Sequence, residues 1–400
     1  MKHIILILFI AISVGWGKAI TLRNLLVTAT QNNQKIKFQQ EKIVESKSKV
    51  SIDSALPDPQ LTGGYFLSPI ETKTGPQEWK IGISQKIPLG GKLSVQENLA
   101  LIDIDIAQVK LLQTKLSIQT QLINYFEEAR AIKSELKIIN EYISIIQNTE
   151  IIIKSKFKMN MAKQNDVSIL KIERLQLKDS QTILQNKIII IYNNIESLLG
   201  KPFEDELEFS EIQLDISKYN NYLNNTHYKI AQLEVTKSEL NIKLSKLSYI
   251  PDLIAGLDYI HIDSNVGEDP FMVKFGVNLP IWFGKNNAKV KSSKANNRAT
   301  NYQFTDIDNH NLAQYSMLNF DLKNSHRTAK LYRDKLIPTA QITMNSLQLS
   351  YISGNTSFVD YMGAFKLVLK LQKTQIINIK NYQLANARLL EFTGQLLETE

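Results

Sequence analysis

The sequence predicts a mostly α-helical fold with a small membrane β part. Long antiparallel coiled-coil helices would occur in two repeats, and each chain would supply four transmembrane β-strands. Three observations lead to this prediction. An apolar seam with a coiled-coil period follows a strand-like segment. The arrangement of strands and helices occurs twice along the chain. The strand-like segments number four, too few to close a barrel within one chain.

The first 19 residues have the pattern of a secretory signal peptide. Lys2 and His3 form a basic start, residues 4–14 are apolar, and Gly17-Lys18-Ala19 offers the small residues of a cleavage site. The apolar stretch is shorter than the roughly 18 residues that a membrane span needs. We therefore expect residues 1–19 to be removed on export, which leaves no stretch of spanning length and excludes a polytopic inner-membrane protein.

Composition excludes further classes of protein. The chain has no cysteine, so it is neither a disulfide scaffold nor anchored through a lipidated cysteine. Its formal charge of +8 falls to +6 when Lys2 and Lys18 leave with the signal peptide. Because these charges are scattered and form no basic block, we expect no nucleic-acid partner.

The longest helix is predicted from about residue 92 to 155. Its apolar positions alternate steps of three and four: Ile118, Leu122, Tyr125, Ala129, Ile132, Leu136, Ile139, Ile143 and Ile146. A helix of that length, roughly 95 Å, needs neighbours along its side. We expect it to turn within 156–170, and the returning helix to end where Gly200 can form the C-terminal cap and Pro202 blocks continuation.

The chain repeats itself at a nearly constant separation. Moving 194 residues onward carries Asp166 onto Asp360 and Gly200 onto Gly394. In the strand region an offset of 192 matches Pro59 with Pro251, Gly64 with Gly256 and Pro88 with Pro280. These matches predict a first structural repeat over 20–217 and a second over 218–400.

Four segments have the two-residue period of strands: about 60–67, 78–88, 252–262 and 271–280. Apolar side chains alternate with small or polar ones. The polar positions would give a partly basic inner surface with Lys80, Ser84, Lys86, Lys274 and Asn278. Such segments are long enough to cross a bilayer when tilted.

Aromatic residues occur at the ends of these segments, where the interfacial girdle of a membrane barrel lies. They are Trp79, Tyr65, Tyr259, Trp282 and Phe283. A closed barrel needs about eight strands, and open sheet edges do not occur in lipid. If this sheet lies in a membrane, several chains must share one barrel. The alternative is a sheet whose apolar face packs on the helices.

Several stretches carry a resemblance to a known family. They are "ITLRNLLVTATQNNQKI", "IPDLIAGLDY", "IPLGGK", "LPIWFGK", "LYRDKLIPTAQ", "SYISGNTSFVDYMGA" and "LLEFTG". In this order, and within an arrangement that occurs twice, the chain resembles the TolC-like outer-membrane efflux proteins over nearly all of 20–400. The stretches "PDPQLTGGYF" and "GISQKIPLGGK" look more like the heavy-metal efflux branch than the type I secretion branch.

The resemblance implies a homotrimer with one shared twelve-stranded barrel, embedded in the lipid of the outer membrane of a Gram-negative bacterium. A helical tunnel would extend the barrel into the periplasm. The protein would then be the passive outer duct of a tripartite efflux pump (RND-type) or of a type I export system. Its partners would be a periplasmic adaptor (membrane fusion protein) and an inner-membrane transporter.

The strand-to-helix junctions contain proline followed by glycine. Pro88 and Pro280 lack the N–H that would continue strand pairing, and Gly90, Gly91 and Gly284 can adopt backbone angles that other residues avoid. We expect these five residues to be hinges between tilted strands and near-axial helices. An ordinary turn is the alternative.

No enzymatic site stands out in the sequence. The histidines lie far apart, and no nucleophile with a base, glycine-rich phosphate loop or paired carboxylates is present. We expect no catalytic residues, no cofactor and no metal.

A candidate aperture lies at the helical turns far from the strands. The resemblance places Asp360 there, and Asp166 is its counterpart in the first repeat. Three copies of Asp360 around one axis would favour cations. The alternative is helix capping, because Ser357-Phe-Val-Asp360 matches a capping box and Asn165 stands beside Asp166. Gly363 departs from relatives that carry a second acid there.

A second functional class stays open, namely a periplasmic coiled-coil adaptor or scaffold of an export complex. Such a protein would have one helical hairpin flanked by small β-domains. Here the strands lie between helices and the whole unit is doubled, which favours the duct.

Overall fold

The computed structural model describes residues 19–73, 75–159, 162–210, 214, 219, 221–263 and 267–397 of the chain. The predicted signal peptide, except Ala19, lies outside the described residues, and so does the predicted repeat boundary at 217/218. Within the described ranges, none of the helices combines the length and apolar character that a bilayer crossing needs.

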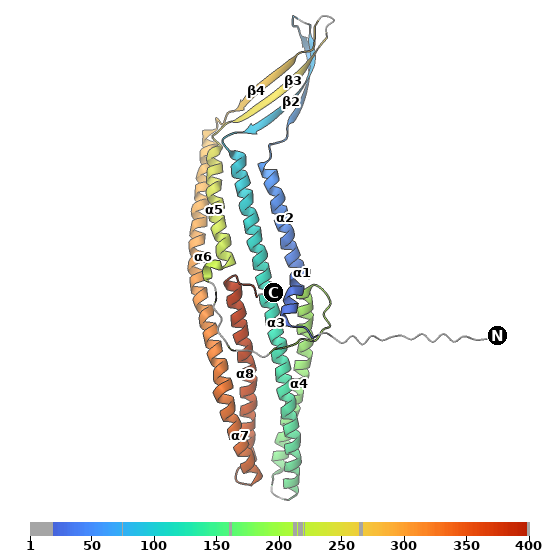
Figure 1. The fold of residues 1–400 in the computed structure, drawn as a ribbon, viewed down its shortest axis with the longest axis vertical. Helices are drawn as coiled ribbons and strands as arrows, with labels where there is room; N and C mark the ends of the chain where they lie inside the picture. Colours follow the sequence, from blue (N-terminus) through green and yellow to red (C-terminus); the bar gives the residue numbers. More distant parts are fainter. Residues whose placement is uncertain are drawn as a thin grey trace, which may run out of the picture.

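Long helices form most of the molecule, and a four-stranded sheet projects beyond one end of them (Figure 1). The elements are α1 (Leu22–Asn32), α2 (Gln34–Ser54), β1 (Gln60–Ile70), β2 (Gln77–Pro88), α3 (Lys92–Lys158), α4 (Gln164–Leu199), η1 (Tyr222–Asn224), α5 (Thr226–Leu247), β3 (Asp252–Ile262), β4 (Phe271–Asn278), α6 (Phe283–Leu331), η2 (Tyr332–Leu336), α7 (Ile337–Ile352) and α8 (Phe358–Phe392). The predicted fold class of long helices with a small antiparallel sheet is confirmed.

α3 is the central helix of the helical part. Its 67 residues make it about 100 Å long at 1.5 Å per residue. It packs on α2 and α5 in the half next to the sheet, and on α4 and α8 in the other half (Figure 1). Of the predicted seam, Leu122, Ala129 and Ile139 are fully buried. The coiled-coil period therefore identified the side of α3 that its neighbours cover.

The helical hairpins turn at the end of the molecule opposite to the sheet (Figure 1). The α3–α4 turn falls after Lys158, within the predicted window, and α4 ends at Leu199 with Gly200 in the left-handed conformation. The segment before β1 forms two helices, because Asn33 ends α1 and its side-chain oxygen accepts hydrogen bonds from the first N–H groups of α2.

The same contact occurs in both halves of the chain. Asn33 Nδ2 donates to the Leu198 carbonyl at 2.7 Å, and Asn225 Nδ2 donates to the Phe392 carbonyl at 3.0 Å. Each carbonyl lies just before a left-handed glycine, Gly200 or Gly394. Matching atoms thus recur 192 to 194 residues apart.

The sheet is antiparallel with the order β1-β2-β3-β4. β1 continues to Ile70, beyond the predicted end at 67, and β2 begins at Gln77 instead of 78. β3 has the predicted bounds. β4 ends at Asn278 rather than 280, because the chain turns there with a hydrogen bond from Ile281 N–H to the Leu279 carbonyl.

Candidate functional site

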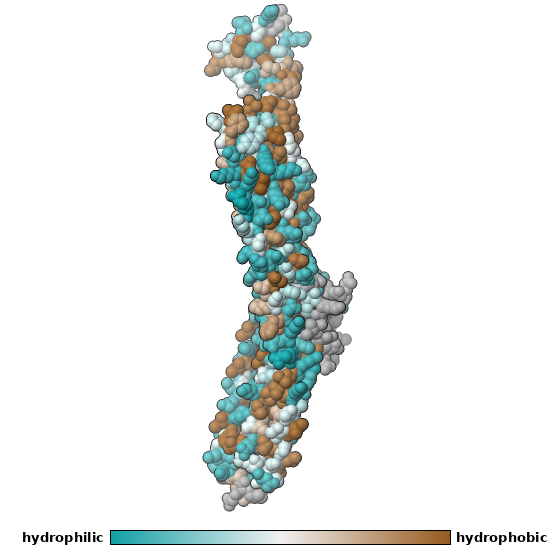
Figure 2. Space-filling model, turned by 90° about the vertical axis from the view of Figure 1, so that its left-hand side faces the viewer, coloured by the Kyte–Doolittle hydropathy of each residue, from teal (hydrophilic) through white to brown (hydrophobic). Residues whose placement is uncertain are grey.

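One face of the sheet is apolar and uncovered. The register puts Leu61, Ile83, Leu257 and Val273 in one row across the four strands. Phe275 is 77% exposed and Leu61 is 72% exposed. Figure 2 shows hydrophobic side chains on the surface at this end of the molecule. No described helix packs along this face, so the alternative of a sheet packed on the helices does not hold.

Both outer strands have a free edge. β1 pairs only with β2, and β4 only with β3, among the residues that the structure describes. Each edge presents unpaired backbone N–H and C=O groups, which can pair with a strand of another chain. The single chain therefore presents two open edges together with an apolar face.

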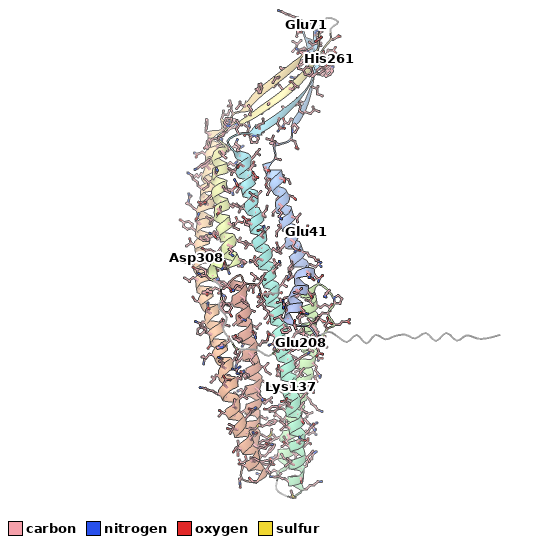
Figure 3. All side chains as sticks on the ribbon, in the orientation of Figure 1. Glu41, Glu71, Lys137, Glu208, His261 and Asp308 are labelled. Atoms are coloured by element: carbon pink, nitrogen blue, oxygen red, sulfur yellow. The ribbon has the colours of Figure 1, made fainter. Side chains whose placement is uncertain are left out.

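The predicted aromatic residues lie at the two ends of the sheet. Tyr65 pairs with Trp79 at the end far from the helices, where Trp79 contacts Tyr259 with ring centroids 5.6 Å apart and stacks on His261 at 5.1 Å. Figure 3 labels His261 at this end. The other two predicted residues, Trp282 and Phe283, are exposed where the strands meet the helices.

The opposite face of the sheet is polar and charged. Asp258 is 1% exposed and forms an ion pair with Lys274 at 2.5 Å. Gly82 leaves the space for this carboxylate, because a Cβ there would lie 1.8 Å from Asp258 Oδ1. Lys80, Ser84, Lys86, Lys274 and Asn278 all occupy this face by register.

Acidic residues on this face were missing from the predicted inner surface. Asp252 pairs with Lys86 at 3.0 Å and with Lys92 at 2.5 Å, at the end next to the helices. Asp258 lies deeper in the sheet. Both residues occupy polar positions of the two-residue strand period. That period could therefore have predicted their place on this face. The face is consequently less basic than the lysines alone suggest.

The two strand-to-helix junctions differ. β2 ends at Pro88, and Gly90 and Gly91 follow with φ of 75° and 76°. A Cβ on Gly90 would lie 2.5 Å from Ile250 Cδ1. After β4, Pro280 lies in a short turn, and Gly284 is already in the first turn of α6 with an ordinary helical backbone. The expectation that Gly284 uses an unusual backbone angle is wrong, because α6 begins at Phe283.

Both candidate aperture aspartates cap helices. Asp360 N–H donates to Ser357 Oγ at 3.1 Å, and the Ser357 hydroxyl donates to the Asp360 carboxylate at 2.6 Å. Asp166 accepts a hydrogen bond from the Lys163 backbone N–H at 3.1 Å. Lys163 is the N-cap position and Asn165 lies inside α4, so Asn165 is not the cap.

Capping leaves the Asp360 charge available. Asp360 is exposed, and the hydrogen bond from the Ser357 hydroxyl lowers its pKa below the ordinary value. Lys156 Nζ ties the end of α3 to the end of α7 by hydrogen bonds to the carbonyls of Tyr351 and Ile352. The two hairpin ends of one chain are therefore held together, with both aspartates near the same end of the molecule.

Within the described ranges, no group of three or more histidine, aspartate or glutamate side chains lies close enough to hold a metal ion. Acidic side chains of the helical wall form ion pairs instead: the buried Glu173 with Lys366 at 2.5 Å, and the half-buried Glu150 with Arg174 at 3.0 Å.

The arrangement is similar to that of solved structures of membrane proteins and channels. VceC, an outer membrane protein of Vibrio cholerae, has a TM-score of 0.76 at 13% identity, over 94% of this chain and 97% of that one. The open state of the MtrE outer membrane channel of Neisseria gonorrhoeae has a TM-score of 0.77 at 13% identity, over 94% and 89%. CusC has a TM-score of 0.77 at 14% identity, over 95% and 93%.

The chain has the outer-membrane-channel fold. No protein-family model and no curated protein matches the sequence. At this low identity the likeness extends to the fold alone, and the outer-membrane-channel fold accounts for the open four-stranded sheet at the end of a helical hairpin bundle.

Proposed function

We propose that this protein is the outer-membrane channel of an export system, a passive and non-enzymatic duct from the periplasm to the exterior. Three chains would contribute four strands each to one twelve-stranded barrel in the outer membrane of a Gram-negative bacterium. The uncovered apolar face with two open edges carries this proposal. Lipid would cover the face, and neighbouring copies would pair the edges.

Two further features support a membrane position for the sheet. Tyr65, Trp79 and Tyr259 form an aromatic cluster at one end, and Trp282 and Phe283 lie at the other. Aromatic residues at both ends of the strands are typical of the two interfacial girdles of a membrane barrel. Pro88, Gly90, Gly91 and Pro280 would then form the transition from tilted strand to helix at the membrane boundary, with Gly284 in the first turn of α6.

We propose that Asp360, with Asp166 of the first repeat nearby, forms the acidic constriction at the closed ends of the hairpins. Replacing Asp360 by Asn removes the charge and should reduce cation preference in planar-bilayer measurements of reversal potential. Ser357→Ala is the matched control, because it removes the cap hydroxyl, costing about 1 kcal/mol of stability, but keeps the carboxylate. Unchanged selectivity in D360N would show that Asp360 serves only as a cap.

The lumen of the barrel would be polar. Lys80 adds positive charge, whereas the ion pairs of Lys274 with Asp258 and of Lys86 with Asp252 are close to neutral. We therefore expect a weak anion preference from the barrel, which Asp360 opposes at the other end of the duct.

The proposed partners are a periplasmic adaptor and an inner-membrane transporter, of the RND-type or of a type I system. Assignment to heavy-metal efflux rests only on the stretches around residues 57–66 and 82–92. Growth in the presence of metal salts and of organic toxicants, with and without the gene, would separate these cargo classes.

The test of the proposed function is recovery of the full chain in the outer-membrane fraction as a detergent-soluble trimer with single-channel conductance. The alternative of a periplasmic adaptor or scaffold predicts that the protein is released by osmotic shock without detergent and produces no conductance.

A further inference from the structure

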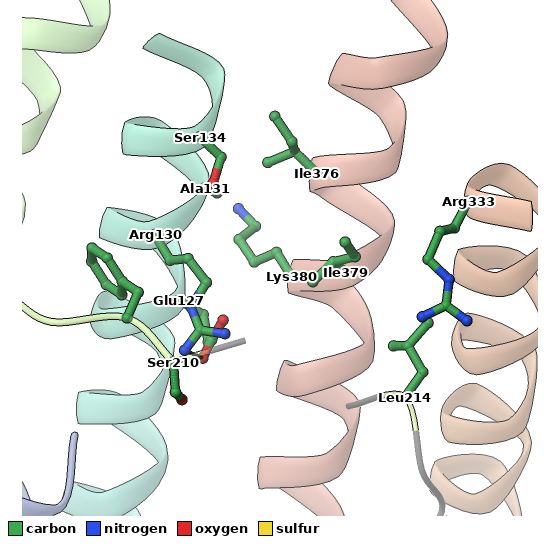
Figure 4. A pocket seen from close by; sticks show the side chains of 11 residues that line it. Glu127, Arg130, Ala131, Ser134, Ser210, Leu214, Arg333, Ile376, Ile379 and Lys380 are labelled. Atoms are coloured by element: carbon green, nitrogen blue, oxygen red, sulfur yellow. Dashed lines mark ion pairs between the residues drawn. The ribbon is translucent and has the colours of Figure 1, made fainter. Parts of the chain in front are cut away.

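Two of the open cavities in the chain have charged linings, and their charges are arranged differently. In one of them, at the middle of α3, Glu127 and Arg130 lie on the same helix (Figure 4), with Glu127 Oε1 3.4 Å from an Arg130 guanidinium nitrogen. That acid and that base are paired within one chain. The other cavity, of about 880 Å³, lies where the polar face of the sheet meets the helices, and it holds charges that are not paired in this way.

Part of the charge in this second cavity is paired within the chain. Asp252 of β3 lies 2.5 Å from Lys92 Nζ and 3.0 Å from Lys86 Nζ. Lys92 Nζ also donates a hydrogen bond to the Ile250 carbonyl at 2.6 Å. The side chains of Asp252 and Lys92 are 12% and 16% exposed, so this pair is largely closed to solvent and satisfied.

Four further charged side chains line the same cavity and form no ion pair among the described residues. They are divided by sign. Asp53 and Asp58, which we call the acidic rim, belong to the end of α2 and to the segment that leads into β1. Lys285 and Lys289, which we call the basic rim, belong to the first two turns of α6, the helix that follows β4. All four side chains are exposed.

Neither rim finds an ion-pair partner on its own helix. α6 has no acidic residue over 283–305, so Lys285 and Lys289 have no acid three or four positions away. On α2, the base four positions before Asp53 is Lys49, which already forms an ion pair within α2 at 2.7 Å. Both rims are therefore available to a second molecule.

The two rims belong to opposite sides of the chain. The acidic rim adjoins β1 and the basic rim adjoins β4, the two outer strands with free edges. In a closed ring of identical copies, one side of each chain meets the other side of the next. Where β4 of one copy pairs with β1 of the next, α6 of the first copy comes to lie beside α2 of the second. Because both rims border one cavity, they lie at the same level of the molecule and can meet.

We propose that the acidic rim of one copy forms ion pairs with the basic rim of the next copy, and that these pairs stabilise the ring of chains where the barrel meets the helices. The inference rests on the proposed trimeric channel and names residues that would hold its copies together. A single exposed ion pair contributes little. Here the same pairs recur at each of the three junctions of the ring.

The test is a charge-reversal cycle on the full chain. Asp53→Lys with Asp58→Lys makes both rims basic, and Lys285→Glu with Lys289→Glu makes both acidic. The measured quantity is the rate of subunit exchange between differently labelled trimers, in a non-ionic detergent at low salt. We expect each double variant to exchange about tenfold faster than the wild type, because repulsion replaces attraction at three junctions. The combination of all four substitutions restores opposite charges and should return the rate to within about threefold of the wild type.

A matched control changes the same kind of charge on the same helix. Lys294 and Arg298 are exposed, do not border the cavity, and lie roughly half a turn around α6 from Lys285. Lys294→Glu with Arg298→Glu should therefore exchange at the wild-type rate. High salt provides a second control, since at about 1 M the Debye length of roughly 3 Å screens exposed charges and should reduce the differences between variants.

The outcomes separate this inference from the proposed function. A trimeric wild type whose double variants exchange at the wild-type rate would overturn the inference alone, and so would a combined variant that exchanges as fast as the double variants. A wild type that is monomeric in detergent would overturn the channel and the inference together. If a charge-reversed variant does not assemble, Asp53→Asn with Asp58→Asn removes the acids without repulsion and should exchange about threefold faster. An unchanged rate in that variant would also contradict the pairing of the rims.

Discussion

At the scale of single residues, the Asp258 side chain in β3 requires a glycine at position 82 in β2. The carboxylate of Asp258 occupies the place where a side chain of residue 82 would begin, and Lys274 neutralises it. A buried carboxylate that loses this arrangement keeps its desolvation cost without its ion pair. The sequence showed both residues on the polar face of their strands, but not that they are neighbours, because the register of β2 with β3 was unknown.

We predict that Gly82→Ala destabilises the protein by about 1–3 kcal/mol, because the new Cβ displaces the Asp258 carboxylate. The midpoint of denaturant unfolding in detergent measures this loss. Gly276→Ala in β4 is the control, since its nearest neighbour, Ile254 Cβ, lies 3.7 Å away and leaves room for a methyl group. Equal stability of the two variants would contradict the account.

Glu127 gives a prediction for the dependence of stability on pH. Burial raises the pKa of Glu127 from 4.5 to about 7. Between these values the folded chain holds a proton that the unfolded chain has lost, so the free energy of unfolding falls as pH rises from 4.5 to 7. The loss is of the order of 3 kcal/mol and is complete above pH 7. Glu127→Gln should remove this part of the slope in unfolding curves recorded between pH 4.5 and 8. Parallel curves for the two proteins would refute it.

The burial of Glu127 could not be predicted from the sequence. The residue follows Phe126 on α3 and is outside the apolar seam. Beside it, Phe209 packs on Phe126, and the segment before Phe209 is held by backbone hydrogen bonds to Ile20. No local pattern links residues so far apart in the chain.

At the scale of elements, the chain passes from strand to helix after both β2 and β4, but the backbone conformation differs between the two junctions. The first uses two glycines in left-handed conformation, and the second a short turn around Pro280 that leads directly into α6. Composition suggested that both junctions use glycine in the same manner. The difference lies in where each helix begins, which spacing alone does not determine.

We predict that Gly90→Ala destabilises the protein by about 1–2 kcal/mol through its positive φ, with an additional clash against Ile250. Gly284→Ala should instead be neutral or stabilising by about 0.5–1 kcal/mol, because a helical glycine is replaced by a better helix former. Thermal unfolding of the two variants measures both effects. A stable G90A variant together with a destabilised G284A variant would reverse the assignment of the hinge.

Helix ends and seams were well predicted, whereas helix interruptions were not. Gly200 ends α4 as its sequence context indicated, and the capping arrangement of Ser357 with Asp360 is present. The π-helical turn η2 was not expected. It comes directly before α7, which has Pro338 in its first turn. Proline has no N–H to donate to a carbonyl of the preceding turn, and its ring would clash there. The wider π-helical turn accommodates the proline.

At the scale of the whole molecule, two matching asparagine contacts support the proposed duplication. The hydrogen bonds of Asn33 to the Leu198 carbonyl and of Asn225 to the Phe392 carbonyl join helices in the same manner in both halves. The four strands, two from each half, meet in one sheet through β2 and β3. The repeat, the coiled-coil period and the strand alternation together made the fold class predictable.

The central claim is that β1 and β4 of neighbouring copies pair in a shared barrel. The chain has no cysteine, so a single pair can be introduced cleanly. Leu61→Cys in β1 is combined in turn with cysteine at Val273, Phe275 or Val277 in β4. Within one chain these positions lie three strand spacings apart, roughly 14 Å, too far for a disulfide. We predict that at least one pair forms a disulfide-linked trimer of three times the chain mass in the outer membrane. Unlinked monomers for all three pairs, in protein that remains monomeric in detergent, would contradict the shared barrel.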